Sequence, residues 1–161
     1  MVADAGGITT ILSALICHES NANLQYHGCV TLQSLAVNDN NKMTIAEARG
    51  ITWILSAMKN HSSNVDMQYY GCAVLQNLAV NNDKNWVMIP EAGGITMILS
   101  AMKSHSSNTD VQYYGCAAIQ ELCCMVHSIP YIHQTILIAI INQNFIAMLI
   151  IFTSTTNVDT K

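Results

Sequence analysis

The chain has 161 residues, of which 51% are apolar and only 10% are charged, and its formal net charge is -4. A chain of this length can bury roughly two thirds of the surface that its unfolded form exposes, so it is long enough to form a full hydrophobic core. The few basic residues create no positive field to attract phosphate backbones, and we therefore expect no nucleic-acid partner.

The N-terminal segment MVADAGGITTILSALIC has no basic residue before its apolar residues. A secretory signal peptide begins with such a positive region, so we do not interpret this segment as one. The sequence therefore predicts a cytoplasmic protein, with the nucleus as the alternative compartment. In that setting we expect the six cysteines to be reduced thiols rather than a disulfide framework.

One segment of the sequence occurs three times. Residues 8–36, 51–79 and 95–123 align without gaps, and 17 of 29 positions agree in the first comparison and 21 of 29 in the second. This agreement identifies an internal repeat with a period of 43 to 44 residues. A period in this range is typical either of helical solenoids or of propeller blades built from strands.

The spacing of the apolar residues decides between these two architectures. Ile51, Ile54, Leu55 and Met58 recur at i, i+3, i+4 and i+7, which is one stripe of a helix. A second stripe at helical spacing begins at Tyr69. The polar loop HSSN separates the two stripes and offers an N-cap for the second helix. Each repeat is therefore expected to hold two clear helices.

The segments between the repeats, NDNNKMTIAEARG and NNDKNWVMIPEAGG, each predict one additional short helix. Asn40 or Asp83 could cap its beginning, and a glycine pair, or Gly50 alone, could end it. Arg49 takes the place of the first glycine in the middle unit, which indicates that only the second glycine is needed there. We therefore expect three helices in a complete unit.

The stretch EAGGITMILSAMKSHSSNTDVQYYGCAAIQEL resembles the armadillo family, whose unit is a short helix, a second helix after an Ala-Gly turn and a long third helix. The resemblance covers about residues 3–126. It implies an all-α fold, a right-handed α-solenoid of three armadillo-like repeats, in which the third helices line a concave groove that holds a protein or an extended peptide. The resemblance specifies no particular task, because one fold can host many functions.

The expected organisation follows from the repeat boundaries. The first unit lacks most of its first helix, and the sequence after the third unit departs from the repeat and is apolar with a polar end. The expected parts are unit 1 (1–37), unit 2 (38–81), unit 3 (82–126) and a divergent C-terminal segment (127–161).

Armadillo proteins of nuclear import carry a Trp on the third helix and an Asn four residues later. The Trp positions of this chain hold Val30, Ala73 and Ala117, so the tryptophan shelf is absent and we do not expect recognition of a nuclear-localisation peptide. The positions one turn earlier hold a histidine and two tyrosines, whose rings offer broad contact area and a polar tip. The predicted protein-binding groove therefore consists of His27, Ser34, Tyr70, Asn77, Tyr114 and Glu121.

A glycine-cysteine pair recurs in each third helix. A glycine inside a helix costs about 1 kcal/mol, so we expect these glycines to permit a close approach of two helices. We expect the cysteines to pack in the core beside them. The pairs are Gly28 and Cys29, Gly71 and Cys72, and Gly115 and Cys116.

A histidine also recurs at the end of each second helix, where a cation interacts favourably with the helix dipole. We interpret these histidines as surface caps rather than metal ligands. The sequence contains no nucleophile elbow, phosphate loop or paired buried carboxylates, so we expect a non-enzymatic protein without cofactor or metal. The recurring histidines are His18, His61 and His105, and an incomplete metal-site pattern lies at Cys123, Cys124 and His127.

The C-terminal segment contains an apolar run over residues 136–152, interrupted by Asn142, Gln143 and Asn144. A membrane-spanning helix needs about 20 consecutive apolar residues, so we expect this run to cover the exposed edge of the third unit instead. The alternative function is a membrane-associated or tail-anchored tethering protein, in which this segment contacts a bilayer. The sequence also leaves open that the segment mediates self-association, and that the chain is a fragment of a longer repeat protein.

Overall fold

The computed structural model of the chain describes residues 6–123, and this part of the protein is all-helical. The C-terminal segment lies outside the described residues, and so do the interpretations that concern it. Among the described helices, none is both long and apolar enough to cross a membrane. In chain order the helices are α1 (Gly7–Cys17), α2 (Ala22–Leu35), α3 (Asp39–Glu47), α4 (Gly50–Asn60), α5 (Val65–Ala79), α6 (Asp83–Glu91), α7 (Gly94–Ser104) and α8 (Thr109–Cys123).

The helices are of three kinds that repeat in order. The short helices α3 and α6 have 9 residues, the second helices α1, α4 and α7 have 11, and the third helices α2, α5 and α8 have 14 or 15. The short helix predicted between the repeats is therefore present twice. We refer to α1–α2 as unit 1, to α3–α5 as unit 2 and to α6–α8 as unit 3.

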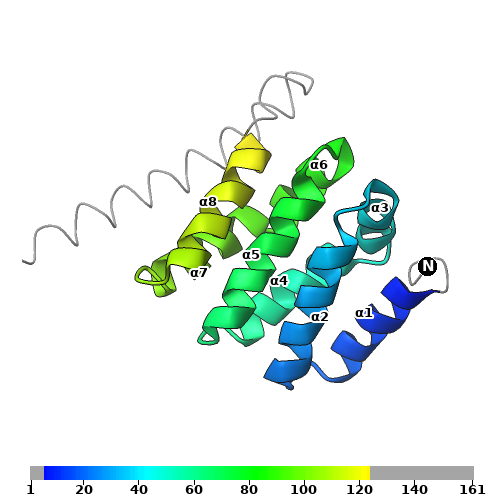
Figure 1. Ribbon diagram of the computed structural model, residues 1–161, viewed down its shortest axis with the longest axis horizontal. Helices are drawn as coiled ribbons and strands as arrows, with labels where there is room; N and C mark the ends of the chain where they lie inside the picture. The colour runs from blue at the N-terminus through cyan, green and yellow to red at the C-terminus, as the bar shows by residue number, and fades with distance from the viewer. Residues whose placement is uncertain (1–5, 124–161) are drawn as a thin grey trace, which may run out of the picture. The chain divides into compact units, whose positions relative to one another are not determined.

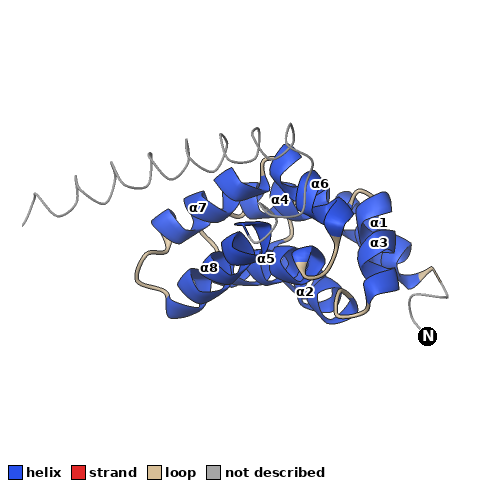
Figure 2. Cartoon of the chain, turned by 90° about the horizontal axis from the view of Figure 1, so that it is seen from above, coloured by secondary structure: helices blue, strands red, loops and turns tan. Residues whose placement is uncertain are grey.

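The second and third helices form two layers. Figure 1 shows the third helices side by side in one row, with α5 between α2 and α8, and both neighbours pack against α5. Each second helix packs against the third helix of its own unit, and Figure 2 shows these second helices as the other layer. The three units of residues 6–123 are therefore stacked on one another in chain order.

The core lies between the two layers, where the apolar stripes meet. The predicted stripe of Ile51, Ile54, Leu55 and Met58 is buried, which confirms the helical interpretation of this pattern. Burying one such side chain stabilises the fold by about 1.5–3 kcal/mol relative to leaving it exposed. The largest fully buried side chains are Ile8, Leu32, Ile45, Ile54, Met58, Met67, Leu75, Leu78, Ile89, Ile98 and Leu122.

Asparagine side chains cap the beginnings of the short and the third helices. The Oδ1 atoms of Asn64 and Asn108 accept hydrogen bonds from backbone N–H groups three residues later, which confirms the N-cap predicted in the HSSN loop. The predicted caps of the short helices are wrong. Asn38 and Asn82 cap α3 and α6, and Asp83, predicted as a cap, is the first residue of α6, where a carboxylate favours the positive end of the helix.

Asn40, the other residue predicted as a cap, lies inside the first turn of α3. The cap is Asn38 because its extended backbone lets its side-chain oxygen accept a hydrogen bond from the N–H group of Asn41, three residues later, at 3.2 Å. Asn41 in turn donates from Nδ2 to the carbonyl of Leu35, at 3.0 Å. The side chain of Asn41 thereby joins the beginning of α3 to the end of α2.

The turn between a short and a second helix explains why two glycines are used. Its first position has left-handed backbone, with φ 85° at Gly93 and φ 61° at Arg49. Its second position has no room for a side chain, because a Cβ at Gly50 would lie 2.7 Å from the carbonyl oxygen of Ile45. The second glycine is therefore required by space, and Arg49 adopts a conformation that costs an L-residue about 1–2 kcal/mol.

Candidate functional site

Aromatic side chains form a continuous row across the third helices. Consecutive ring centroids lie between 4.2 and 5.2 Å apart, in tilted or edge-to-face arrangements. Such geometry is favourable because the positive edge of one ring meets the negative face of the next. We call these six residues the aromatic row, which runs in the order His27, Tyr26, Tyr70, Tyr69, Tyr114 and Tyr113.

The doublet of adjacent rings in each third helix makes this row continuous. Neighbouring residues of an α-helix project about 100° apart, so two adjacent rings point in different directions along the stack. Tyr26 meets Tyr70 of the next unit with the centroids 5.2 Å apart, and Tyr69 meets Tyr114 with the centroids 5.0 Å apart. The first ring of each doublet therefore contacts the second ring of the following doublet.

Two phenol groups of the row, those of Tyr26 and Tyr69, have raised pKa values. Burial, followed by the hydrogen bond with Tyr114, raises the pKa of Tyr69 to about 12. The hydrogen bond with Tyr70 raises the pKa of Tyr26 above its ordinary value, and the carboxylate of Asp66 adds a smaller contribution in the same direction. At physiological pH Tyr26 and Tyr69 therefore present neutral hydroxyl groups that can donate and accept hydrogen bonds.

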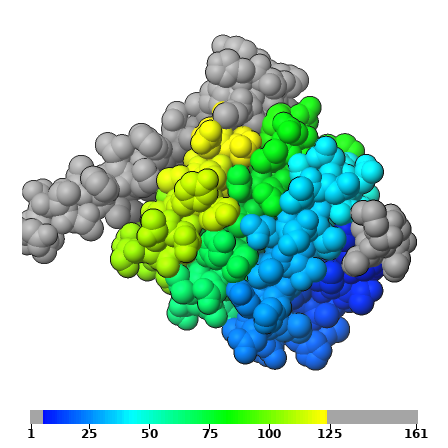
Figure 3. Space-filling view, viewed as in Figure 1, coloured from blue at the N-terminus to red at the C-terminus, as the bar shows by residue number. Residues whose placement is uncertain are grey.

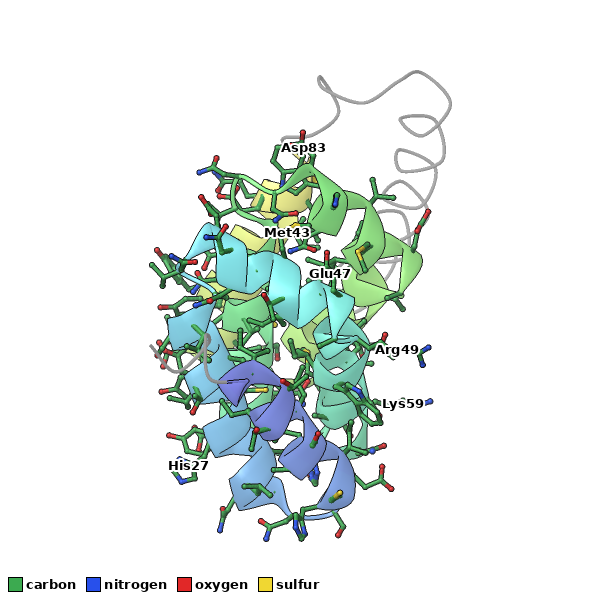
Figure 4. The ribbon with its side chains drawn as sticks, turned by 90° about the vertical axis from the view of Figure 1, so that its right-hand side faces the viewer. His27, Met43, Glu47, Arg49, Lys59 and Asp83 are labelled. Atoms are coloured by element: carbon green, nitrogen blue, oxygen red, sulfur yellow. The ribbon has the colours of Figure 1, made fainter. Side chains whose placement is uncertain are left out.

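The row remains accessible along its length. Tyr113 is 66% exposed and His27 is exposed, while Tyr70 and Tyr114 are half-buried. Figure 3 shows the third helices lying side by side on one face of the molecule. In Figure 4 His27 projects on the opposite side from Arg49 and Lys59. We call the surface that the third helices present with the aromatic row the third-helix face.

The charges of the third helices have one sign. Their sequences contain no Lys or Arg, whereas Asp66 and Asp110 lie in the first turns of α5 and α8 and Glu121 lies near the end of α8. Both aspartates are exposed. The third-helix face therefore combines aromatic rings with carboxylates, an arrangement that attracts cationic side chains.

The second predicted row, Ser34, Asn77 and Glu121, differs from the first because two of its members are engaged with backbone. The Nδ2 atom of Asn77 donates to the carbonyl of Gln33 on α2, at 3.0 Å, and so joins two units. The hydroxyl of Ser34 donates to the carbonyl of Val30 in its own helix, at 3.1 Å. Glu121 is half-buried. Of these three residues, Asn77 is the one that takes part in the contact between units.

The three positions that hold tryptophan in nuclear-import proteins are not on the open surface of this fold. Ala73 is fully buried, and Val30 and Ala117 are half-buried. A large ring at Ala73 would have to displace the packed neighbours of α5. The middle of the stack therefore has no space for a tryptophan at this position.

A glutamine in each third helix, buried in units 1 and 2 and half-buried in unit 3, fixes the helix that carries the row. Gln68 donates from Nε2 to the carbonyls of Met58, at 2.8 Å, and of His61, at 3.1 Å. These carbonyls lie at the end of α4, where the helix leaves its acceptors without partners. Gln25 and Gln112 make the corresponding pair of contacts in the other units. The glutamines thereby clamp each third helix to the end of its second helix.

The recurring glycines lie at the same contact, which confirms the predicted close approach. A Cβ added to Gly71 or Gly115 would lie under 3 Å from the side chain of Met58 or Met102. A Cβ at Gly28 would meet Leu15 in the same way. The second and third helices can therefore approach only because the third helix has no side chain at this point.

The prediction that all three recurring cysteines pack in the core holds for two of them. Burial raises the pKa of both Cys29 and Cys72 to about 12, so these thiols remain protonated and unreactive. The prediction is wrong for Cys116, which is exposed. Its position is covered in units 1 and 2 by the unit that follows, and α8 is the last described helix.

The recurring histidines are C-cap residues of the second helices, as predicted. They also join the units, because Nε2 of His61 lies 2.7 Å from the carbonyl oxygen of Glu19 and Nε2 of His105 lies 2.9 Å from that of Ser62. Within residues 6–123 no three His, Cys, Asp or Glu side chains form a group that could hold a metal ion.

The repeat pattern predicted one ring of each doublet in the groove and missed the other. Tyr26, Tyr69 and Tyr113 are the missed rings, and Tyr26 and Tyr69 make the contacts that join the doublets. The signal was present in the sequence, because the doublet recurs at the repeat period and both of its positions are aromatic in every unit. Assigning the apolar stripe to the core alone concealed it.

No protein-family model matches the chain. Comparisons with curated proteins and with solved structures gave no significant match. The function must therefore be inferred from the third-helix face itself.

Proposed function

We propose that the chain is a non-enzymatic protein-interaction scaffold that binds an extended segment of a partner protein along the third-helix face. We further propose that its stacked units are armadillo-like repeats of a right-handed α-solenoid. The three kinds of helix, their order and the left-handed turn before each second helix support this assignment. The single observation that carries the binding proposal is the aromatic row, which crosses all three units.

The chemistry of the face defines the class of partner. The row is accessible, the phenols of Tyr26 and Tyr69 keep their protons, and the third helices contain carboxylates but no Lys or Arg. Arginine and lysine side chains interact with aromatic faces by about 0.5–1 kcal/mol at exposed sites and more when water is excluded. We therefore propose a partner segment that carries basic side chains at intervals matching the spacing of the units.

The experiment measures binding of the full chain to an array of short peptides of varied sequence. We expect the bound peptides to be enriched in Arg and Lys. Changing Tyr70 and Tyr114 together to alanine should weaken binding about tenfold or more, since truncating a central aromatic anchor costs more than about 1 kcal/mol. Circular dichroism should remain unchanged, because both rings are only half-buried.

Lys59→Ala is the matched control, because Lys59 projects on the opposite side from His27 (Figure 4). This variant should bind the array like the unmodified chain. If the double tyrosine variant also binds like the unmodified chain, the third-helix face is not the binding site. Bound peptides without any enrichment in basic residues would refute the proposed partner class while leaving the face in place.

A further inference from the structure

The same repeat position differs in exposure from one end of the stack to the other. Cys29 and Cys72 are 1% and 0% exposed, whereas Cys116, at the same position of unit 3, is exposed. No described unit precedes Cys29, and yet it is buried. The cover of this position therefore comes from the unit that follows it.

A second repeat position shows the opposite change. Val74 and Ala118 are fully buried, whereas Thr31, at the same position of unit 1, is exposed. No described unit follows Ala118, and yet it is buried. The cover of this position therefore comes from the unit that precedes it.

The two ends of the stack thus expose the two halves of the contact that joins the units inside it. Further positions behave like these two, being half-buried or exposed at one end and more deeply buried in the other units. We call the half on unit 3 the end face, and it consists of Leu99, Met102, Tyr113, Cys116 and Ile119. We call the half on unit 1 the start face, and it consists of Ile11, Ala14, Leu24, Thr31 and Leu35.

Each polar or aromatic contact between units joins two groups, and one group of each kind lies at each end of the stack. Inside the stack, the histidine at the end of a second helix bonds to the carbonyl just after the corresponding histidine of the preceding unit. At the start of the stack the corresponding imidazole belongs to His18. At its end the corresponding carbonyl belongs to Ser106. The aromatic row likewise ends in Tyr113 on unit 3 and in His27 on unit 1.

From these matched halves we infer that a second copy of the chain docks head to tail, with its start face on the end face of the first. This contact has the same geometry as the contacts between units 1 and 2 and between units 2 and 3. The repeat therefore determines which residues of the two copies meet. The aromatic row then continues from Tyr113 of one copy to His27 of the next. The inference goes beyond the proposed binding function and does not depend on it.

This contact is heterologous, because it joins two different surfaces. Each added copy presents a new free end face, so association builds an open chain rather than a closed dimer. Two variants block one face each: Cys116→Arg blocks the end face and Thr31→Arg blocks the start face. Both residues are exposed, so neither substitution disturbs the interior of a single chain.

The experiment is analytical ultracentrifugation of the full-length proteins over a range of concentrations in detergent-free buffer. We expect the average mass of the unmodified chain to rise with concentration, and each variant alone to remain monomeric. An equimolar mixture of the two variants still has one intact end face and one intact start face. It should therefore form dimers, with about twice the monomer mass, and nothing larger. Thr44→Arg, a substitution of an exposed residue on α3, should associate like the unmodified chain.

Thiol labelling read by peptide mass spectrometry provides an independent measurement. Labelling of Cys116 should slow as the protein concentration rises, while that of Cys17, which is exposed and outside both faces, should not change. Three results would overturn the inference. They are a chain that stays monomeric at every concentration, variants that associate as the unmodified chain does, and a Cys116 that is protected equally at all concentrations. The last result would show that the same chain covers the end face.

Discussion

Units 2 and 3 have almost the same sequence, but the structure packs them differently. Cys72, Met58 and Gln68 are buried in unit 2, whereas Cys116, Met102 and Gln112 are exposed or half-buried in unit 3. The contacts inside each unit are alike, since the glycine approach and the glutamine clamp occur in both. The difference comes from the neighbour, because unit 2 lies between two units and unit 3 is the last described unit.

The comparison teaches that the burial of a residue is not set by its position in the repeat, but by the units on either side of it. A cysteine of the repeat is inert where the following unit covers it and accessible where no described unit does. Contacts inside a unit fix how its helices pack, while contacts between units decide which side chains are protected from water. Matched substitutions in units 2 and 3, measured at low protein concentration, can therefore separate these two contributions.

The largest difference is expected for arginine at the recurring cysteine. Cys72→Arg would place an unpaired charge in the middle of the core, so we expect it to lower the free energy of unfolding by about 4 kcal/mol or to prevent folding. Cys116→Arg should change it by less than about 0.5 kcal/mol, because the side chain reaches water. Urea denaturation followed by circular dichroism measures both. Equal losses would show that the two positions are equally buried in solution.

A smaller difference is expected for the glutamine clamp. Gln68→Ala leaves two carbonyls at the end of α4 without their donor inside the core, which should lower the free energy of unfolding by about 2 kcal/mol. Gln112→Ala should lower it by only about 1 kcal/mol, since the carbonyls around a half-buried side chain can bond to water. The denaturation midpoints of the two variants decide this, and a larger loss for Gln112→Ala would contradict the comparison.

The turns of units 2 and 3 should respond in opposite directions. Arg49→Gly relieves a left-handed L-residue, so we expect it to raise the free energy of unfolding by about 0.5–1 kcal/mol. Gly93→Ala should lower it by about 1 kcal/mol, and only through the backbone, because an added Cβ meets nothing within 4 Å. Thermal unfolding of both variants provides the test. A stability loss in Arg49→Gly would indicate that the arginine side chain makes a contact worth more than the strain.

The smallest effect appears only at alkaline pH. The pKa of Tyr69 is raised to about 12 from its ordinary value of 10.0, so the folded state holds its proton more tightly than the unfolded state. The resulting stability is fully present below pH 10 and is lost as the pH rises through about 12. Tyr69→Phe should therefore flatten the fall of the denaturation midpoint over this range. Identical pH profiles for the variant and the unmodified chain would contradict the proposed burial of the phenol.

The sequence predicted the helical repeat well because the repeat depends on short-range patterns of residues. The i, i+3, i+4, i+7 stripe, the HSSN cap and the glycine-cysteine pair depend on residues close together in the chain. The beginnings of the short helices were predicted less well, since four polar residues follow one another at Asn38 to Asn41 and only backbone geometry selects the cap.

The candidate site could be predicted only in half, because its geometry depends on how one unit lies on the next. Tyr70 and Tyr114 were identified from their repeat position, but of the rings that contact them from the neighbouring doublets, Tyr69 was placed only in an apolar stripe and Tyr26 was not singled out. Asn77 was expected to face a partner, and its side chain instead bonds to the backbone of α2. The recurring doublet marks the rings in the sequence, but which groups pair between units depends on how one unit lies on the next.

By itself the sequence determined the helices, their period and the residues that let two helices of one unit approach. Spacing, capping and the absence of a side chain act within a unit, so every copy of the repeat contains them. Only the tertiary structure decided which copies of a residue are buried, which rings meet and which faces stay open. Stacking removes the inner units from water and leaves the outer ones exposed, although the residues are the same.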